Sequence, residues 1–221
     1  ARVSFPDHEA FWSARYRDAG DDYLFGIAPN KFLVEQAEYF GDGVSVLSVA
    51  DGEGRNAVWL AEQGCAVTAT EISSVALEKA AKLARGRHVA TTEAMAGPRV
   101  DFIQADIFNW DWPQAAFDVV VGIFIQFAGP AERPAQMAGM KQAVKPGGLL
   151  LLQGYTPKQL EFRTGGPSAV ENLYTSAVLR ELFADWEIIS LREHEDTIAE
   201  GNAHVGHSAL IDLVARKPTD R

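Results

Sequence analysis

Two glycines and several polar residues, set between an apolar run and a helix-like pattern, form the stretch best suited to chemistry. It reads V-A-D-G-E-G-R-N, from Val49 to Asn56. Glycine at positions 52 and 54 lets the backbone turn sharply and lets a ligand approach the peptide plane, because no Cβ stands in the way. The helix that follows would direct free N–H groups and its positive dipole end at that ligand. These residues therefore predict a turn that binds a nucleotide.

Two acidic residues farther along the chain could complete the site. Glu71 ends the next apolar segment and could accept hydrogen bonds from ribose hydroxyls, and Asp106 follows a third one, where it could accept from an adenine amino group. Gly52, Gly54 and Ala57 satisfy G-x-G-x-x-A, a pattern that also fits NAD. The glycine pattern alone therefore does not identify the nucleotide, and the other elements of the chain must be considered.

The apolar segments alternate with helical patterns. Strands are predicted at residues 44–50, 65–71, 99–105, 117–124 and 149–153, and helices directly after the glycine turn, at 75–85 with Ser73 or Ser74 as N-cap, and at 131–144. The K-P-G-G stretch at 145–148 suits a tight turn. Nearly continuous apolar strands between helices are typical of a parallel sheet covered on both faces, which binds ligands at the C-terminal ends of its strands.

The end of the chain departs from this alternation. A predicted helix near 176–183 precedes apolar segments at 186–191 and 208–215, with a polar loop between them. Two strands with no helix between them make an antiparallel hairpin at the sheet edge. The sequence therefore predicts an α/β fold: a Rossmann-like, seven-stranded, mostly parallel sheet with a C-terminal antiparallel hairpin and helices on both faces.

Three features favour S-adenosyl-L-methionine (SAM) over NAD. Asp106 supplies a second acid for the adenosine, the chain has no second mononucleotide half that would hold a nicotinamide, and the closing hairpin reverses one strand. We expect a single domain over residues 1–221. Its parts are an N-terminal helical lid segment at 1–40, a cofactor-binding core at 41–153, and a substrate-side segment with the closing hairpin at 154–221.

Several motifs carry a resemblance to a known family. They are W-x-x-R-Y from Trp12, Y-x-F-G-x-x-P-N from Tyr23, G-E-G-R-N from Gly52, A-D at residues 105–106, F-D-V-V at 117–120, K-P-G-G, T-G-G-P at 164–167 and E-G-x-x-H from Glu200. With these pieces the chain, from residue 12 to about residue 217, resembles the class I SAM-dependent methyltransferases, and within them the small tellurite-resistance and thiopurine-type branch. The resemblance implies methyl transfer from SAM to an acceptor held in line with it.

The resemblance and the patterns together assign candidate site residues. The predicted cofactor-binding residues are Trp12, Tyr16, Phe25, Ala50, Asp51, Gly52, Glu53, Gly54, Asn56, Glu71, Ile72, Asp106, Ile107, Gly122, Ile123 and Phe124. The aromatic residues at 12, 16 and 25 would form a lid that excludes water, and Arg15 or Arg17 could meet the cofactor carboxylate. The predicted substrate-side residues are Phe127, Tyr155, Arg163 and His204.

One position departs from the family pattern. The family usually has an acid where this chain has Ser48, and that acid helps to fix the loop and, often through water, the methionine ammonium group. Serine can still accept a hydrogen bond, and Asp51 or Glu53 could supply charge nearby. The departure therefore bears on cofactor affinity rather than on the fold.

Methyl transfer needs a general base only when the acceptor starts protonated. His204 is the candidate for that role, because the closing hairpin could bring it to the strand ends. His204 and His207 form H-x-x-H, but no companion ligands accompany them, so no metal site is predicted. We expect Cys65, the only cysteine, to be a small buried residue.

Composition limits the choice of partners. The formal net charge is −10 over 221 residues, which argues against a broad electrostatic grip on nucleic acid. The segment at residues 122–127 reads G-I-F-I-Q-F and lacks the D/N-P-P-Y/F motif of enzymes that methylate amino groups of nucleic acids. No apolar run reaches the length of a membrane helix, and no basic leader precedes an apolar stretch, so we expect a cytoplasmic protein without a membrane or nucleic-acid partner, as a monomer or homodimer.

The favoured function is methylation of a small molecule, such as a thiol or another soft nucleophile. Two alternatives stay open. The first is an NAD-dependent oxidoreductase, which NADH binding in place of SAM binding would reveal. The second is a protein that binds SAM without turnover, which the serine at position 48 motivates.

Overall fold

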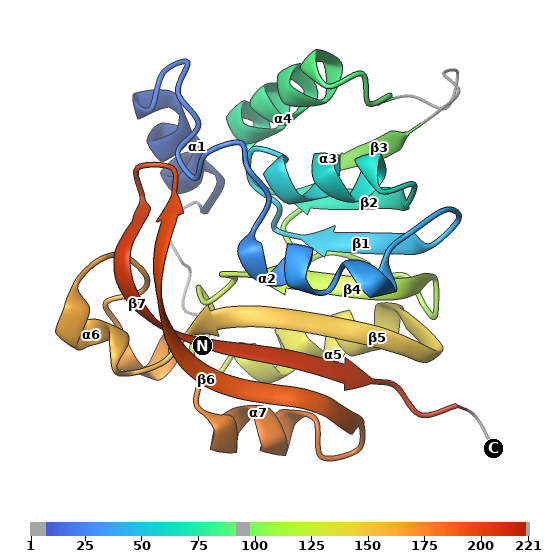
Figure 1. The fold of residues 1–221 in the computed structure, drawn as a ribbon, viewed down its shortest axis with the longest axis vertical. Coiled ribbons are helices and arrows are strands. Elements are labelled where there is room, and N and C mark those ends of the chain that lie inside the picture. The colour runs from blue at the N-terminus through green and yellow to red at the C-terminus, as the bar shows by residue number, and fades with distance from the viewer. Residues whose placement is uncertain (1–7, 92–97, 220–221) are drawn as a thin grey trace.

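Seven strands form one mixed sheet in the computed structural model, which describes residues 8–91 and 98–219. Their order across the sheet is β3-β2-β1-β4-β5-β7-β6 (Figure 1). β7 is the reversed strand, since it pairs antiparallel with both β5 and β6 while the other pairs are parallel. The strands are β1 (Ser45–Val49), β2 (Ala66–Glu71), β3 (Arg99–Gln104), β4 (Phe117–Ile123), β5 (Val144–Tyr155), β6 (Glu187–Glu200) and β7 (His204–Arg216). The predicted fold class is confirmed.

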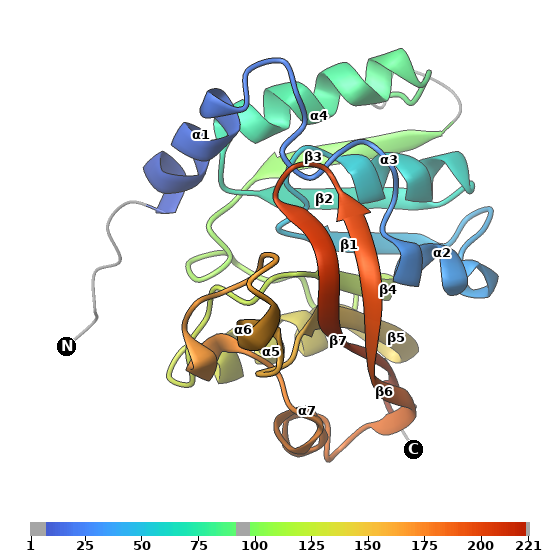
Figure 2. The same ribbon diagram turned by 60° about the vertical axis from the view of Figure 1, so that its left-hand side comes forward.

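Helices cover both faces of this sheet (Figures 1 and 2). They are α1 (His8–Asp18), α2 (Lys31–Glu35), α3 (Arg55–Glu62), α4 (Ser74–Gly86), α5 (Arg133–Ala143), α6 (Gln159–Phe162) and α7 (Ser176–Leu182), with 3-10 turns η1 (Ala37–Tyr39) and η2 (Val170–Asn172). Apolar residues of α2, α3 and α4 share one core cluster with the sheet, and those of α5 and α7 share the other. Strands buried between two such clusters read as continuous apolar runs, which is why β1, β4 and β5 are visible in the sequence.

Side chains at the helix starts fix where the helices begin. Of the two serines predicted as the cap of α4, Ser73 is the N-cap, and its Oγ accepts from the Ala76 N–H at 3.2 Å. Thr175 caps α7 in the same way, with its Oγ1 3.2 Å from the Val178 nitrogen. Gly54 precedes α3 in the left-handed region at φ 89°. These caps hold the helix ends that face the C-terminal edge of the sheet.

The closing hairpin is longer than the sequence predicts. The expected polar loop at residues 192–207 is mostly strand, since β6 continues to Glu200 and β7 begins at His204. The polar residues there lie on an edge strand and pair across it or with neighbouring segments, as Arg192 does with Asp212 and Lys158 with Glu195. The expected turn at K-P-G-G is also part of a strand, β5, with Gly147 at φ 76°.

The tip of this hairpin lies against the N-terminal segment that joins α1 to α2 (Figures 1 and 2). The N–H groups of Asn202 and Ala203 both donate to the carbonyl oxygen of Leu24, at 3.0 and 3.2 Å. Gly26 and Gly201 meet at this contact, where a Cβ on Gly26 would lie 2.9 Å from the Gly201 nitrogen. Two segments far apart in the sequence therefore close together over the C-terminal edge of the sheet.

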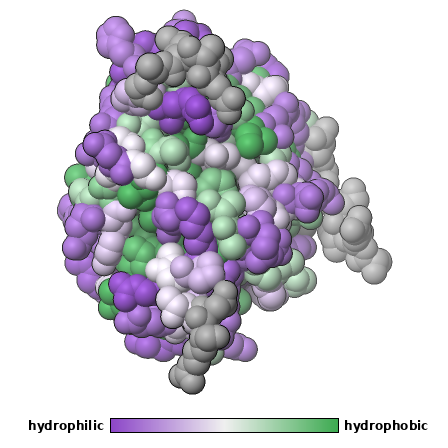
Figure 3. Space-filling model, turned by 90° about the vertical axis from the view of Figure 1, so that its right-hand side faces the viewer, coloured by the Kyte–Doolittle hydropathy of each residue, from purple (hydrophilic) through white to green (hydrophobic). Residues whose placement is uncertain are grey.

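The opposite end of the sheet is shown in Figure 3, where hydrophilic residues separate small hydrophobic areas. None of the helices in the described ranges 8–91 and 98–219 has the length and apolar character that a membrane crossing requires.

The segment after β3 depends on a close contact with α5. The Trp112 indole donates from Nε1 to the Ile107 carbonyl oxygen at 3.1 Å, and its ring packs on Gly139. A Cβ on Gly139 would lie 2.4 Å from two atoms of that ring. The absence of a side chain at position 139 therefore lets Trp112 anchor the residues that follow β3.

We predict that Gly139→Ala and Gly86→Ala change stability in opposite directions. An alanine is usually about 0.5–1 kcal/mol better than glycine in a helix, and we expect that gain for Gly86→Ala because a Cβ there meets nothing within 4 Å. Gly139→Ala should instead destabilise by about 1–3 kcal/mol, because the anchored indole cannot yield without strain. Urea unfolding of both variants checks this, and equal stabilisation by both would contradict the packing argument.

Candidate functional site

A cavity of about 470 Å³ opens at the C-terminal ends of the central strands. Its walls come from α1, the glycine turn after β1, the ends of β2 and β4, the segment after β3, residues 165–169 and the hairpin tip. This is the edge at which parallel α/β sheets bind ligands. The cavity is large enough for a small organic molecule.

The glycine turn combines a ligand-facing part with a packing part. Ala50, Gly52 and Gly54 all lie in the left-handed region, at φ 50°, 64° and 89°. Ala50 and Gly52 line the cavity, whereas Gly54 does not. A Cβ on Gly54 would lie 2.8 Å from the Cβ of Ala80, so this glycine lets α3 and α4 approach each other.

Glu71 is fixed at the end of β2 by two backbone N–H groups. Its Oε2 accepts from Gly52 and its Oε1 from Ser73, both at 2.9 Å. The side chain is buried, and burial raises the pKa of its carboxyl while the backbone hydrogen bonds oppose that rise. Each oxygen keeps a second lone pair, so a carboxylate held at the cavity wall can still accept from hydroxyl groups.

Asp51 accepts a hydrogen bond from Ser48, the residue that departs from the family pattern. The Ser48 hydroxyl donates to Asp51 Oδ1 at 2.5 Å, while Oδ2 is buried without a hydrogen-bond partner among the described residues. Burial raises the pKa of Asp51 to about 7, although the Ser48 hydrogen bond opposes this. Asp51 lines the cavity, with the charges of Glu71 and Arg55 nearby. An unpaired acceptor of this kind suits a cationic nitrogen.

Asp106 lies on the same cavity wall, beyond β3. Its Oδ1 accepts from the Phe108 N–H at 3.1 Å and its Oδ2 from the Asn109 amide at 2.5 Å. The carboxylate therefore organises its own turn, and it remains within the cavity lining beside Ile107.

The polar side chains of G-E-G-R-N hold the N-terminal segment in place. Glu53 accepts from the Leu24 N–H at 2.7 Å and pairs with Lys79 at 2.5 Å. Asn56 Oδ1 accepts from the Asn30 N–H at 2.9 Å. Glu53 was predicted to bind the cofactor, but its buried carboxylate lies outside the cavity lining because these two contacts turn it toward the N-terminal segment.

Arg55 belongs to the same motif and reaches in two directions. Its Nη1 donates to the Ala28 carbonyl oxygen at 3.3 Å, and its Nη2 pairs with Glu200 Oε2 at 2.6 Å. Both charged side chains of this pair are nearly inaccessible to solvent. The motif thus joins the glycine turn, the N-terminal segment and the hairpin tip.

The predicted aromatic lid lines the cavity. The rings of Trp12 and Tyr16 stack with centroids 6.0 Å apart, and Phe25 meets Tyr16 edge-on at 6.3 Å. The Arg15 guanidinium lies 5.0 Å from the centre of the Trp12 ring and also lines the cavity. These contacts place apolar surface over one side of the site, where it excludes water.

His204 lies at another wall of the same cavity, among aromatic rings. Its ring centroid is 4.7 Å from Phe25, 4.6 Å from Phe124 and 5.6 Å from Tyr155. Burial lowers the pKa of His204, and the nearby Glu200 carboxylate opposes that effect. The Tyr155 hydroxyl is buried without a hydrogen-bond partner among the described residues. This end of the cavity is therefore apolar, with two polar groups left available.

Most of the predicted site residues lie in one place. Those that line the cavity are Trp12, Tyr16, Phe25, Ala50, Asp51, Gly52, Asn56, Glu71, Ile72, Asp106, Ile107, Ile123, Phe124, Phe127, Tyr155 and His204. Glu53, Gly54, Gly122 and Arg163 lie outside the lining. Gly122 packs inside the core, where a Cβ would lie 2.7 Å from Ile125, and Arg163 ends α6 at φ 55°.

The sequence interpretation did not assign several lining residues to the site. They include His8, Arg55, Phe108, Gln126, Asn172 and residues 165–169. The T-G-G-P motif was a usable signal for the last group. Gln126 gave no such signal: its amide binds the backbone of Tyr155 at both ends, at 2.8 and 2.6 Å. Within the ranges 8–91 and 98–219, no group of three His, Cys, Asp or Glu residues is arranged to hold a metal ion.

Comparison with solved structures gives similar folds at low identity. The protein studied in the conversion of a disulfide bond into a thioacetal group during echinomycin biosynthesis matches with a TM-score of 0.74 and 20% identity, over 96% of this chain and 93% of that chain. TehB from Haemophilus influenzae matches with a TM-score of 0.66 and 18% identity, over 95% of this chain and 66% of that chain. At this identity the likeness shows the fold.

Sequence comparison adds a family model and a curated relative. A carboxy-S-adenosyl-L-methionine synthase from Photorhabdus laumondii is 26% identical over 129 residues, which are 58% of this chain and 47% of the relative. The chain thus spans about half the length of that relative. Residues 46–148 match a family model described as a methyltransferase domain. Residues 46–148, which include strands β2 to β4 and most of β1, are thus similar to a methyltransferase domain.

Proposed function

We propose that this protein transfers the methyl group of SAM to a small-molecule acceptor, a thiol or another soft nucleophile. The observation that carries the proposal is a single cavity with two unlike ends. Fixed carboxylates of Glu71 and Asp51 line one end, and aromatic rings with His204 line the other. We also keep the small tellurite-resistance and thiopurine-type branch as part of the proposal, supported by the G-E-G-R-N motif.

The residues present fit SAM. The unpaired Asp51 Oδ2 suits the ammonium of the methionine part, Glu71 suits the ribose hydroxyls, and Asp106 suits the adenine amino group. Arg15, on the lid helix, would meet the carboxylate. When bound, SAM supplies a methyl group already activated on a positively charged sulfur.

The chain itself would position the reactants and exclude water from the cavity. Aromatic residues of the lid and of the β4 end exclude water, and residues 165–169 close the cavity from another side. Holding two reactants in line can contribute on the order of 7–11 kcal/mol to the lowering of a barrier. No single catalytic side chain is therefore required to lower the barrier by a large amount.

Two other functions are weighed against this one. The curated relative is a synthase that is not named as a methyltransferase, so the fold does not fix the reaction. Binding of SAM without turnover remains the second candidate. An oxidoreductase that uses NAD is disfavoured, because the reversed strand β7 lies where a dinucleotide fold continues with parallel strands.

We predict that Glu71→Ala abolishes binding of SAM and S-adenosylhomocysteine. Calorimetric titration of the wild type should give micromolar affinity. Glu71→Gln should weaken binding less than alanine, because the amide retains one oxygen that can accept from one of the two N–H groups, Gly52 or Ser73. Glu187→Gln, on the exposed far end of β6, is the matched control. Binding that is indifferent to Glu71, or binding of NADH in place of SAM, would overturn the site assignment.

We predict that SAM affinity depends on pH through Asp51. The carboxyl is half protonated near pH 7 in the free protein, and an ammonium group requires the carboxylate. Affinity should therefore fall as the pH decreases below about 7, and binding near pH 7 should release protons, seen as an enthalpy that depends on the buffer. Asp51→Asn should bind about 10–100-fold more weakly at pH 8, without this pH dependence.

The same variant should be more stable than the wild type at high pH. Because the folded-state pKa of Asp51 lies above its unfolded value, the wild type loses stability as the pH rises from about 4 to 7. Asp51→Asn has no such loss, so its Tm at pH 8 should exceed that of the wild type by a few degrees, and the difference should vanish near pH 4. Equal Tm values at pH 8 would show that burial of the ionised Asp51 carboxylate does not destabilise the wild type.

A substrate screen tests the proposed reaction itself. Thiols, phenols, amines and chalcogen oxyanions are supplied with SAM, and formation of S-adenosylhomocysteine is measured. We expect turnover with thiols. SAM binding without turnover of any acceptor would favour the binding protein over the enzyme.

A further inference from the structure

A buried carboxylate lies beside His204 that the proposed function has not used. Glu200 ends β6, four residues before His204, and its Oε2 lies 3.9 Å from His204 Nδ1. That distance exceeds a hydrogen bond, and Nδ1 is buried without a hydrogen-bond partner among the described residues. The second ring nitrogen, Nε2, is not buried in this way, and His204 lines the cavity. Nε2 is thus the nitrogen that can face a ligand.

Glu200 is held rigidly from two sides. Arg55 Nη2 pairs with its Oε2 at 2.6 Å, and the Asn30 amide donates from Nδ2 to its Oε1 at 2.9 Å. Burial raises the pKa of Glu200, but the His204 ring and the Arg55 guanidinium together lower it to about 2. Glu200 is therefore an anion at any physiological pH, at a fixed place behind the imidazole.

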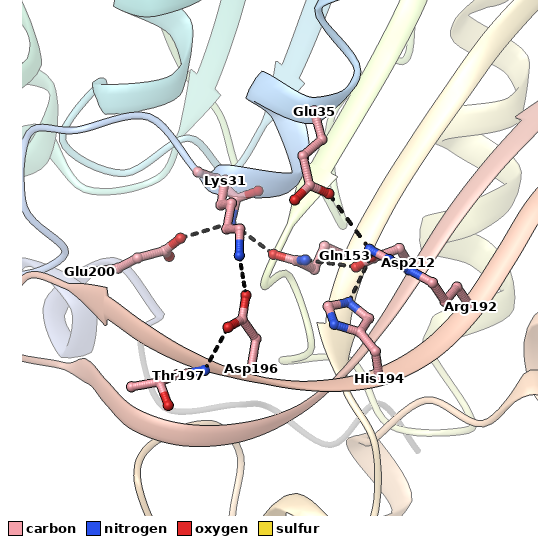
Figure 4. Close-up of polar contacts among 10 residues, drawn as sticks. Lys31, Glu35, Gln153, Arg192, His194, Asp196, Thr197, Glu200 and Asp212 are labelled. Atoms are coloured by element: carbon pink, nitrogen blue, oxygen red, sulfur yellow. Dashed lines mark hydrogen bonds and ion pairs between the residues drawn. The ribbon is translucent and has the colours of Figure 1, made fainter.

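Asn30 connects this anion to a second buried acid. Its Nδ2 also donates to Gln153 Oε1 at 2.7 Å, and Gln153 Nε2 donates to Asp212 Oδ1 at 2.6 Å. Figure 4 shows Gln153 between Glu200 and Asp212, with Arg192 and His194 pointing toward Asp212. The hydrogen bonds form one continuous chain from the edge of the sheet to Glu200. Each acid in the chain has a cationic partner, so the chain fixes geometry without leaving a charge unpaired.

From this arrangement we propose that Glu200 is a positioning residue that holds the proton of the neutral His204 ring on Nδ1, so that Nε2 serves as the base toward a neutral acceptor. The inference rests on the proposed function for the identity of the reaction. The geometry selects the tautomer, because a proton on Nδ1 lies toward the carboxylate and a lone pair there would be repelled by it.

The proton then has a balanced route. A thiol acceptor reaches the site as R–SH, its proton moves to Nε2, and the bonding electron pair stays on sulfur. The products are a thiolate and an imidazolium, whose positive charge faces Glu200. Thiols are suited to this step, since their pKa of about 8.5 lies close to that of imidazole, whereas alcohols are much weaker acids. The surrounding rings of Phe25, Phe124 and Tyr155 also suit sulfur.

Other charged groups act on the same imidazole. Arg55 on α3 and Arg15 on α1 disfavour the imidazolium, while Glu200 favours it. Tyr155 on β5 faces the ring with a hydroxyl whose pKa is raised by burial, so it stays neutral. Burial has the largest effect on His204, and it lowers the pKa of the ring. The His204 ring is therefore unprotonated at neutral pH, the form that a general base requires.

The test is nitrogen NMR of the imidazoles in the protein without added ligand, with His204→Gln used to assign the signal. In the wild type we expect the Nδ1–H tautomer of His204 and a pKa below the usual range. In Glu200→Gln the tautomer preference should be lost and the pKa should fall further, because the anion that favours the imidazolium is gone. A residue that served the fold alone would leave the tautomer unchanged in a folded variant.

Two further variants keep the test decisive. Because Glu200→Gln leaves Arg55 unpaired, the double variant Arg55→Gln, Glu200→Gln removes both charges together and should also lose the tautomer preference. Glu195→Gln is the matched control: on the same hairpin, Glu195 Oε2 lies 2.8 Å from His207 Nε2 at an exposed position, and its loss should leave His204 unchanged.

The outcomes separate this inference from the proposed function. A wild-type His204 that is protonated at pH 7, or that carries its proton on Nε2, overturns the inference, as does an unchanged tautomer in both Glu200 variants. These spectra need no SAM. Failure of the wild type to bind SAM overturns the proposed function while leaving the His204 result standing.

Discussion

The buried pair of Arg55 and Glu200 is the contact on which the site depends. Arg55 follows the glycine turn, Glu200 lies at the hairpin tip, and the same guanidinium also binds the N-terminal segment at Ala28. A buried pair contributes little net stability, but losing one partner costs about 3–5 kcal/mol because the other is left as an unpaired charge. Hairpin tip, N-terminal segment and glycine turn must therefore adopt their positions together, and the cavity exists only when they do.

A second constraint is the crowding of acids around the glycine turn. Asp51 and Glu71 line one cavity, and Glu53 lies close by with Lys79 as its partner. Burial is the main reason that the pKa values of Asp51 and Glu71 are raised, and the neighbouring carboxylates raise them further. A cationic ligand relieves that repulsion. The empty site is accordingly less stable than its packing would allow, a common relation between stability and binding function.

The sequence predicted the parts of the fold whose causes are local. β1, β4 and β5 are visible because both of their faces are buried. The cap of α4 was narrowed to Ser73 or Ser74, because a cap needs one side chain beside one helix start. The length of the hairpin was not visible, since charged residues of an edge strand, such as Arg192, give a pattern that resembles a loop. The contact of Glu53 with the Leu24 N–H and the contact of Arg55 with Glu200 were also missed. They join residues 29 and 145 positions apart, and no local pattern records such a contact.

The meeting of Gly26 and Gly201 links two surface loops that a sequence alignment would treat as independent. Both glycines lie at positive φ, and a Cβ on Gly201 would lie 2.3 Å from the Gly26 nitrogen. A side chain on either loop therefore displaces the other loop's backbone. A hairpin tip with a side chain at position 201 would require a matching change in residues 24–28. The backbones of the two loops are therefore constrained as a pair.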